Sequence, residues 1–225
     1  MYRMEAVKGI DMCDSRVSYG SVDFTKDDLV SQDDPYAQFN HWFKQAKECD
    51  AIAEPNAMAI ATCSANIPSV RMVLMKWIGP NGLVFFTNLC SRKGRELEDN
   101  PNASVVFYWP PLHRQIRVEG KVKKLSEEES TKYFHSRPRD SQISASVSKQ
   151  SSVIESKVVL RQEHERLKQK YADESVPIPK PPDWGGYIIE PSCFEFWQGH
   201  SDRLHDRIVF AQQSDSTWTV QLLAP

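Results

Sequence analysis

The sequence has none of the patterns that identify the most familiar catalytic and metal-binding sites. Its five cysteines are odd in number and scattered, without a Cys-x-x-Cys pair, so we expect neither a disulfide framework nor a zinc site. Free and mostly buried thiols in a reducing compartment are expected instead. No Gly-x-Gly-x-x-Gly follows a strand, which disfavours a Rossmann fold, and a Walker loop, Gly-x-Ser-x-Gly and His-Glu-x-x-His are absent as well.

The chain also lacks an excess of charge of one sign and any long hydrophobic run. Lys and Arg number 28 and Asp and Glu number 30, a formal net charge of −2, which argues against a broad nucleic-acid interface. No stretch approaches the ~20 apolar residues of a membrane span, and the N-terminus lacks the apolar core of a signal peptide. We therefore expect a cytoplasmic protein that binds neither membrane nor nucleic acid, and any anion site must be local.

What the sequence does contain is the composition of a soluble globular domain, with 40% hydrophobic and 26% charged residues. Residues 1–33 are polar and irregular and predict a mobile N-terminal arm, followed by a single domain over residues 34–225. A helix is predicted within residues 33–51, where Asp34 can cap it and Pro35 suits its first position. Its apolar face comprises Phe39, Trp42, Phe43 and Ala46.

The rest of the domain alternates short strand-like runs with turn residues. Their close spacing favours antiparallel neighbours and predicts an α+β fold, a small β-barrel with peripheral helices. Helices are expected within residues 91–100, 126–138 and 155–174. Strands are expected over residues 56–63, 68–77, 83–88, 103–109, 113–125, 185–199, 203–210 and 216–224.

The segment SRKGREL places two cations where a helix should start. Ser91 suits the N-cap, so Arg92 and Lys93 would fall in the first turn and oppose the helix dipole. A sequence that accepts this arrangement can gain a bound anion, held by amides, guanidinium and ammonium together. The alternative is that both side chains simply extend into water.

Other polar residues in apolar surroundings are further candidates. Arg71 and Lys76 would point to opposite faces of one regular strand. Tyr133, Arg137 and Ser141 gather a phenol, a guanidinium and a hydroxyl around a helix end, which could cradle a phosphate. Taken singly, each could equally be structural or serve as a helix cap. The same holds for Gln115, Gln150 and Ser151.

In the segment QGHSDRLHDRIVF, three cationic or titratable side chains alternate with other residues. If this segment is a strand, Arg203, His205 and Arg207 share one face. Aromatic residues including Trp197 precede them and an apolar run follows, so this face could line a pocket for an anionic, planar ligand. A solvated strand face is the alternative. Because no carboxylate dyad stands out, any chemistry would come from an anionic cofactor that the protein positions.

Taken together, these segments resemble one known family. RMVLMK, FFTN, SRKGREL, YFHSRPRDSQI, QSSVI, EFWQG and RLHDR appear in the order and at about the spacing of the pyridoxine (pyridoxamine) 5′-phosphate oxidase family, from about residue 16 onward. The resemblance implies a homodimer with a split β-barrel and FMN at the subunit interface. It also implies oxidation of pyridoxine or pyridoxamine 5′-phosphate to pyridoxal 5′-phosphate in vitamin B6 salvage, with hydride transfer from substrate C4′ to flavin N5, O₂ as acceptor and H₂O₂ as product.

The resemblance also assigns roles to individual residues. Arg203 and His205 would be catalytic and, with Leu204, would hold the substrate's pyridine ring against the flavin. The substrate phosphate would be held by Lys76, Tyr133, Arg137 and Ser141. FMN contacts would come from Arg71, Met72, Val73, Leu74, Phe86, Thr87, Arg92, Lys93, Gln115, Gln150, Ser151, Trp197 and Arg207, some of them from the second subunit. Possible arm contacts with the active site or with pyridoxal phosphate are Arg16, Val17, Ser18 and Tyr19.

One departure from the family pattern and two alternative functions remain open. Leu222 stands where the family usually has an arginine near the C-terminus, and the loop before it is short, which puts the contacts of the last strand in question. The first alternative is a split-barrel flavoprotein with another substrate. The second is a non-catalytic protein that binds pyridoxal phosphate.

Overall fold

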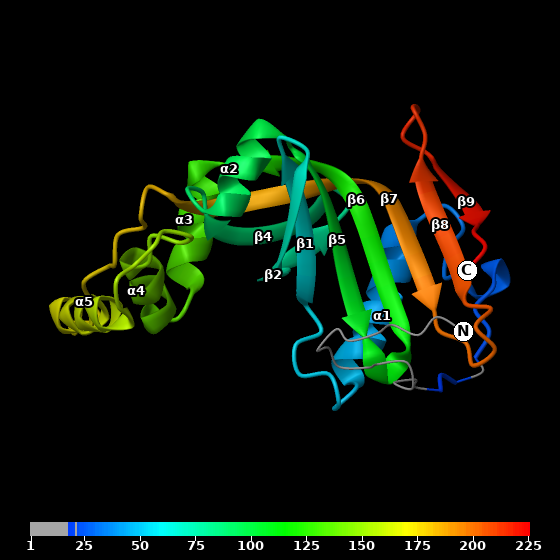
Figure 1. Ribbon diagram of the computed structural model, residues 1–225, viewed down its shortest axis with the longest axis horizontal. Helices are drawn as coiled ribbons and strands as arrows, with labels where there is room; N and C mark the ends of the chain where they lie inside the picture. The colour runs from blue at the N-terminus through cyan, green and yellow to red at the C-terminus, as the bar shows by residue number, and fades with distance from the viewer. Residues whose placement is uncertain (1–17, 21) are drawn as a thin grey trace, which may run out of the picture.

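The computed structural model describes residues 18–20 and 22–225 and shows an α+β fold (Figure 1). In these residues nine antiparallel strands form a single sheet; the first helix packs against the core face of the sheet, and the other helices lie at its ends and edges. The strands are β1 (Ala57–Ser64), β2 (Ile67–Leu74), β3 (Trp77–Gly79), β4 (Gly82–Asn88), β5 (Asn102–Trp109), β6 (Arg114–Lys124), β7 (Trp184–Gln198), β8 (Asp206–Gln212) and β9 (Trp218–Leu222). The helices are α1 (Pro35–Glu48), α2 (Arg92–Asp99), α3 (Glu127–Ser136), α4 (Arg139–Val147) and α5 (Lys157–Lys170), with short 3-10 turns η1 (Lys26–Asp28) and η2 (Pro110–Leu112).

The long strand β7 is where the sheet divides. Its first half pairs with β4 and its second half pairs with β8, while β6 accompanies it along nearly its whole length. The ladder order is β2-β1-β5-β6-β7-β4-β3, with β8 and β9 branching from β7. A register shift beside Gly120 bends the β6–β7 pair at the point of branching. The sheet therefore forms a split β-barrel, as the family resemblance implies.

The barrel encloses a largely aromatic core. Phe107 on β5 and Phe194 and Phe196 on β7 are fully buried, and Trp42 of α1 packs edge-on against Phe196 at 5.4 Å between ring centroids. Helix α1 begins as predicted, because the Asp34 side chain accepts from two backbone amides of its first turn. Each fully buried phenylalanine contributes roughly 2–3 kcal/mol of transfer free energy.

Part of the expected arm belongs to this core. Phe24 is only 6% exposed and packs on Trp42, and its backbone N–H donates to Asp206 at 2.9 Å. Lys26 donates to the carbonyl of Val220. The packed domain therefore starts before Asp34, so the expected boundary after residue 33 lies too late in the chain.

The structure also corrects three local expectations. Strand β8 begins at Asp206, so the residues from Arg203 to His205 form the turn before it and share no strand face with Arg207. Helix α4, which the sequence analysis did not predict, begins directly after Pro138. Among the four cysteines that the structure describes, all are free, but Cys90 is exposed and the others are half-buried.

A smaller hydrophobic core, separate from that of the barrel, lies where α3, α4 and α5 pack beside the β4 end of the sheet. It consists of buried side chains from these helices, the loop before β7 and β7 itself: Phe134, Ile143, Leu167, Ile178 and Trp184. In the part of the chain that the structure describes, no helix has the length and apolarity needed to cross a membrane.

Candidate active site

A cavity of about 520 Å³ opens between the end of β2, strand β4 and helices α3 and α4. A neighbouring cavity of about 390 Å³ continues it along β2 and the start of α2. Together they bring most of the predicted ligand contacts to one place. The first is lined by Met72, Val73, Leu74, Lys76, Phe86, Thr87, Lys93, Tyr133, Arg137, Ser141 and Gln150, and the second by Arg71, Met72, Arg92, Lys93, Gln150 and Ser151.

One wall of the larger cavity is a stack of aromatic rings. Phe86 lies nearly parallel to Tyr133 at 3.9 Å and to Trp184 at 5.4 Å between centroids. The residue paired with Phe86 on β7 is Gly186, where an added Cβ would stand 2.6 Å from the phenylalanine ring. Glycine at this position therefore leaves the space that the ring occupies.

Arg137 extends the stack with a charged plane. Its guanidinium lies 4.9 Å from the Trp184 ring centroid, and its Nη1 is buried without a hydrogen-bond partner among the described residues. Burial lowers the pKa of Arg137, and burial raises the pKa of Tyr133 beside it. An anion that bound here would be stabilised by Nη1 of Arg137, because a buried donor without a hydrogen-bond partner is costly in free energy.

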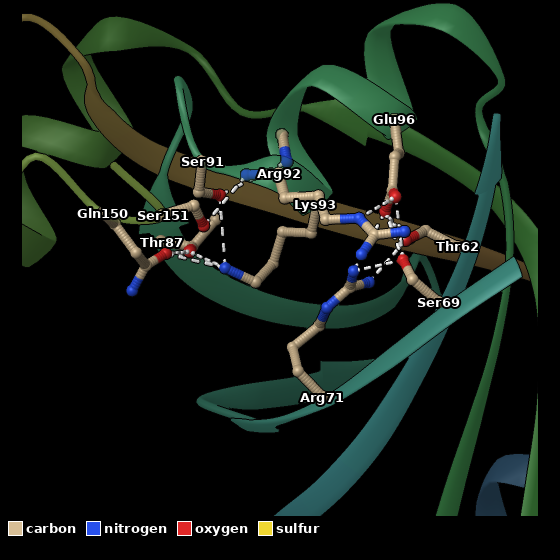
Figure 2. A network of polar contacts seen from close by, with 11 residues as sticks. Thr62, Ser69, Arg71, Thr87, Ser91, Arg92, Lys93, Glu96, Gln150 and Ser151 are labelled. Carbon is tan, nitrogen blue, oxygen red and sulfur yellow. Dashed lines mark hydrogen bonds and ion pairs between the residues drawn. The ribbon is translucent and has the colours of Figure 1, made fainter. Parts of the chain in front are cut away.

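Lys93 is the buried cation between the two cavities. Its ammonium donates to Gln150 Oε1 at 2.7 Å, to Thr87 Oγ1 at 2.9 Å and to Ser91 Oγ at 3.2 Å, all neutral acceptors (Figure 2). Burial, followed by the positive charge of Arg71, lowers its pKa to about 8. Lys93 therefore carries a charge near neutral pH that is only partly compensated.

Two arginines on the other side of Lys93 share one carboxylate. Figure 2 shows Arg71 from β2 and Arg92 from α2 both pointing at Glu96, at 2.9 Å and 2.7 Å. Helix α2 starts as predicted, since Ser91 accepts from the Gly94 amide. The Arg92 backbone amide donates at 3.1 Å to the hydroxyl of Ser151, whose positive φ of 70° lies in the left-handed region.

The remaining predicted contacts form a second cluster on β6, β7, β8 and the connection between β7 and β8, towards the opposite end of the sheet in Figure 1. Gln115 pairs with Trp197, and Trp197 pairs with Arg207. His205 lies 4.8 Å from the Trp197 ring, and its Nδ1 accepts from the backbone N–H of His200 at 2.9 Å. Arg203, with φ of 72°, and Leu204 are exposed in the turn. None of these residues lines the two cavities described above.

The guanidinium of Arg207 is fixed in this cluster. It donates to the buried Glu195 at 2.8 Å and to the carbonyl of Ala224 at 2.9 Å. Leu222 pairs with Ile208 in a regular β8–β9 ladder, so the last strand forms despite the departure from the family pattern.

Of the four arm residues, the structure describes Ser18 and Tyr19, whereas Arg16 and Val17 lie outside the described residues. Ser18 is exposed. The Tyr19 ring packs edge-on against His205 at 5.7 Å and against Trp197 at 5.9 Å. This part of the arm therefore contacts the second cluster.

A third cavity, of about 580 Å³, lies elsewhere in the molecule and fits an anion poorly. It lies between β1, β5, β6 and β7, and its charged lining consists of Glu119, Glu190 and Lys121. Two carboxylates against one ammonium give this cavity a negative balance, so the smaller cationic cavities are the better candidates.

The sequence analysis missed several residues of the site. Glu96 was not singled out, although its spacing from Arg92 by four residues on a predicted helix is a signal for a pair. The cationic cavity of about 520 Å³ is also lined by Trp184, Ser144 and Ser148. The two serines lie on or directly after α4, a helix that the sequence analysis did not predict.

The fold and the cavity define a split-barrel protein with a cationic, aromatic-walled site suited to phosphate-bearing planar ligands. Comparison with family models matches "Pyridoxamine 5'-phosphate oxidase" over residues 45–171 and "Pyridoxine 5'-phosphate oxidase C-terminal dimerisation region" over residues 184–225. The chain belongs to the pyridoxamine 5′-phosphate oxidase family, a family of oxidoreductases.

Individual relatives agree over most of the chain. Pyridoxine-5′-phosphate oxidase of Bos taurus is 52% identical over 85% of this chain and 78% of its own length. Pyridoxine/pyridoxamine 5′-phosphate oxidase of Crocosphaera subtropica is 45% identical over 96% of this chain and 100% of its own. Among solved structures, PhzG from Burkholderia lata 383, in complex with tetrahydrophenazine-1-carboxylic acid, has a TM-score of 0.83 and 32% identity, covering 92% of this chain and 100% of that one.

Proposed function

We propose that this protein is an FMN-dependent oxidase that converts pyridoxine and pyridoxamine 5′-phosphate to pyridoxal 5′-phosphate, with O₂ as acceptor and H₂O₂ as product. The names of the relatives at 52% and 45% identity support this substrate class. The observation that carries the proposal is the cavity itself, where Nη1 of Arg137, buried without a partner among the described residues, lies beside a wall of stacked rings. A planar ring with a phosphate group satisfies both features at once.

The residues present also fit FMN. Lys93, Arg71 and Arg92 gather positive charge beside the N-terminus of α2, where a ribityl phosphate would be held. Lys93 has neutral acceptors only, and within the described residues the two terminal nitrogens of Arg92 have no hydrogen-bond partner. FMN, when bound, would accept a hydride at N5 from substrate C4′.

The substrate phosphate would occupy the other end of the larger cavity. Lys76, Arg137 and Ser141 contribute an ammonium, a guanidinium and a hydroxyl to its lining, and Tyr133 adds a phenol. Two separate cationic groups, one for each phosphate, account for local positive clusters in a chain of net charge −2. Holding both ligands side by side would supply most of the catalytic effect through orientation.

We infer that the second cluster completes the site of the partner subunit in a homodimer. In one chain, Trp197, His205 and Arg207 do not line the cationic cavities. Apolar side chains next to both places are exposed to solvent, with Met72 at 63% and Leu204 at 68%. Exposed apolar surface beside an incomplete site is typical of an interface.

Within that composite site, Arg203 and His205 would hold the substrate ring. The Nδ1 of His205 accepts a hydrogen bond, so a neutral ring carries its proton on Nε2 and can donate it there. Arg203 would stabilise charge that develops on the ring during hydride loss. Neither role requires a carboxylate dyad.

The experiment is anaerobic mixing of the purified protein with each phosphorylated vitamer, followed by admission of air. The proposal predicts a yellow protein whose flavin absorbance bleaches with either vitamer and returns with release of peroxide. Yellow protein that neither vitamer bleaches would favour a flavoprotein with another substrate. Colourless protein that binds pyridoxal phosphate would favour a non-catalytic binding protein. Either result would overturn the proposal.

A further inference from the structure

The most densely bonded polar group near the cationic cavities is a carboxylate that does not line them. Glu96 lies on α2 and is 7% exposed. Four side chains donate to it: Thr62 at 2.5 Å, Ser69 at 2.6 Å, Arg92 at 2.7 Å and Arg71 at 2.9 Å. These donors come from β1, β2 and α2, so Glu96 joins three elements at one point (Figure 2).

The way in which Glu96 binds the two arginines leaves other donors free. Glu96 accepts a hydrogen bond from Nε of Arg92, while the two terminal nitrogens of that guanidinium have no partner among the described residues. Arg71 uses its two terminal nitrogens for Thr62, Ser69 and Glu96, and its Nε has no partner within the described part of the chain. Both guanidinium groups therefore keep N–H donors in reserve, and both residues line the smaller cavity.

Thr62 links Arg71 to Glu96 by a second route. Its hydroxyl accepts from Arg71 and donates to Glu96, so the three groups close a ring of hydrogen bonds. Burial alone would raise the pKa of Glu96, but the four donors lower it to about 2, so the group is ionised at neutral pH. A flexible arginine loses less freedom on binding an anion when its guanidinium is already fixed.

We propose that Glu96 is the positioning residue of the FMN phosphate site, fixing the guanidinium groups of Arg71 and Arg92 from behind so that their remaining N–H groups face the phosphate. The inference rests on the proposed function, because it assumes that FMN binds beside Lys93. Glu96 itself touches neither ligand in this arrangement.

The test compares FMN with riboflavin, which has the same ring system but no phosphate. Glu96→Gln should weaken FMN binding by about tenfold to a hundredfold, the range seen when groups that orient metal ligands are removed. Riboflavin binding should stay close to that of the wild type, because riboflavin has no phosphate for the two arginines to hold, so the ratio of the two affinities falls. Glu96→Asp keeps the charge but withdraws the carboxylate by one methylene group, and it should lower the same ratio by a smaller factor.

The matched control is Glu98→Gln, on the same helix. Glu98 is exposed, and its only ion pair among the described residues is with Lys124. This variant should bind both flavins as the wild type does. Affinities can be measured by quenching of flavin fluorescence in the apoprotein, with the melting temperature of each variant as a check of folding.

Three results are distinguishable. A selective loss of FMN affinity in both Glu96 variants supports the proposal. Unchanged FMN affinity in Glu96→Asp and Glu96→Gln, or an equal loss for FMN and riboflavin, overturns it and leaves Glu96 a purely structural role. A wild-type protein that binds neither flavin refutes the proposed function instead.

Discussion

Raising the pH from 7 to 9 should weaken FMN binding to the apoprotein about tenfold. Lys93 has a pKa of about 8 without ligand, because burial and the charge of Arg71 oppose its protonation. A bound phosphate dianion favours the charged ammonium and should return the pKa towards the ordinary value of 10.5. The complex then binds more protons than the apoprotein above pH 8, so affinity falls as pH rises.

The magnitude follows from these two pKa values. At pH 9 about one apoprotein molecule in eleven has a charged Lys93, whereas at pH 7 about nine in ten do. The apparent dissociation constant therefore rises by about a factor of ten, equal to about 1.4 kcal/mol. A phosphate monoester loses its second proton near pH 6, so the ligand stays largely dianionic across this range.

The assay is a fluorescence titration of FMN with apoprotein at pH 7, 8 and 9 and constant ionic strength. Lys93→Met is the matched variant: it should bind FMN more weakly, with a dissociation constant independent of pH in this range. Riboflavin should show no such pH dependence in the wild type. A flat profile for wild-type protein, or an equal slope in Lys93→Met, would refute the reasoning.

Three further predictions concern other parts of the molecule. Arg203→Leu should retain FMN while kcat/KM falls at least about a hundredfold, and normal turnover would remove the role assigned to Arg203. Phe107→Ala should lower the free energy of unfolding by about 3–5 kcal/mol, because its ring is fully buried in the barrel; urea denaturation measures this, and a loss below about 1 kcal/mol would contradict the packing. Since the pKa of Glu96 is about 2 rather than 4.5, the unfolded chain binds more protons between these values, so the free energy of unfolding should decrease as pH falls from about 5 to 2. Glu96→Gln should flatten this decrease, and equal slopes in the two proteins would show that another group causes it.

Periodicity and turn chemistry were enough to predict most of the architecture. Helix α1 begins where Asp34 caps it, and the helix predicted from Ser91 is found as α2. These elements could be predicted because their signals are local: a cap residue followed by a repeat of apolar or charged positions. The split form of the barrel, which the family resemblance implied, is confirmed as well.

Two errors have physical reasons that the sequence does not display. Alternation in RLHDR indicates a strand, yet pairing with β7 starts only at Asp206, because the preceding residues must make the connection between β7 and β8. In that connection the Leu204 amide donates to Asp202 and Arg203 takes a positive φ. Helix α3 ends before Pro138 as predicted, but proline also suits a helix start, and α4, which was not predicted, follows it directly.

The candidate site could be predicted only in part, for a similar reason. Lys76, Tyr133, Arg137 and Ser141 line one cavity, and their contact with a substrate phosphate stays a prediction. The bonding of Glu96 to residues on β1 and β2 depends on the packing of α2 against the sheet, which no local pattern specifies. In the proposed homodimer the two clusters would meet only across the subunit interface, so neither a local sequence pattern nor one subunit can display that contact.

The most direct test of the composite site is subunit complementation. Arg137→Met disables the cationic cavity and Arg203→Leu disables the second cluster, so each homodimer should be inactive. When the two variants are co-expressed with different tags, a mixed dimer would contain one site without either substitution. Random mixing should then restore about one quarter of wild-type oxidase activity, since half of the dimers are mixed and half of their sites are intact. Mixed dimers that form and bind FMN but remain inactive would contradict a site shared between subunits.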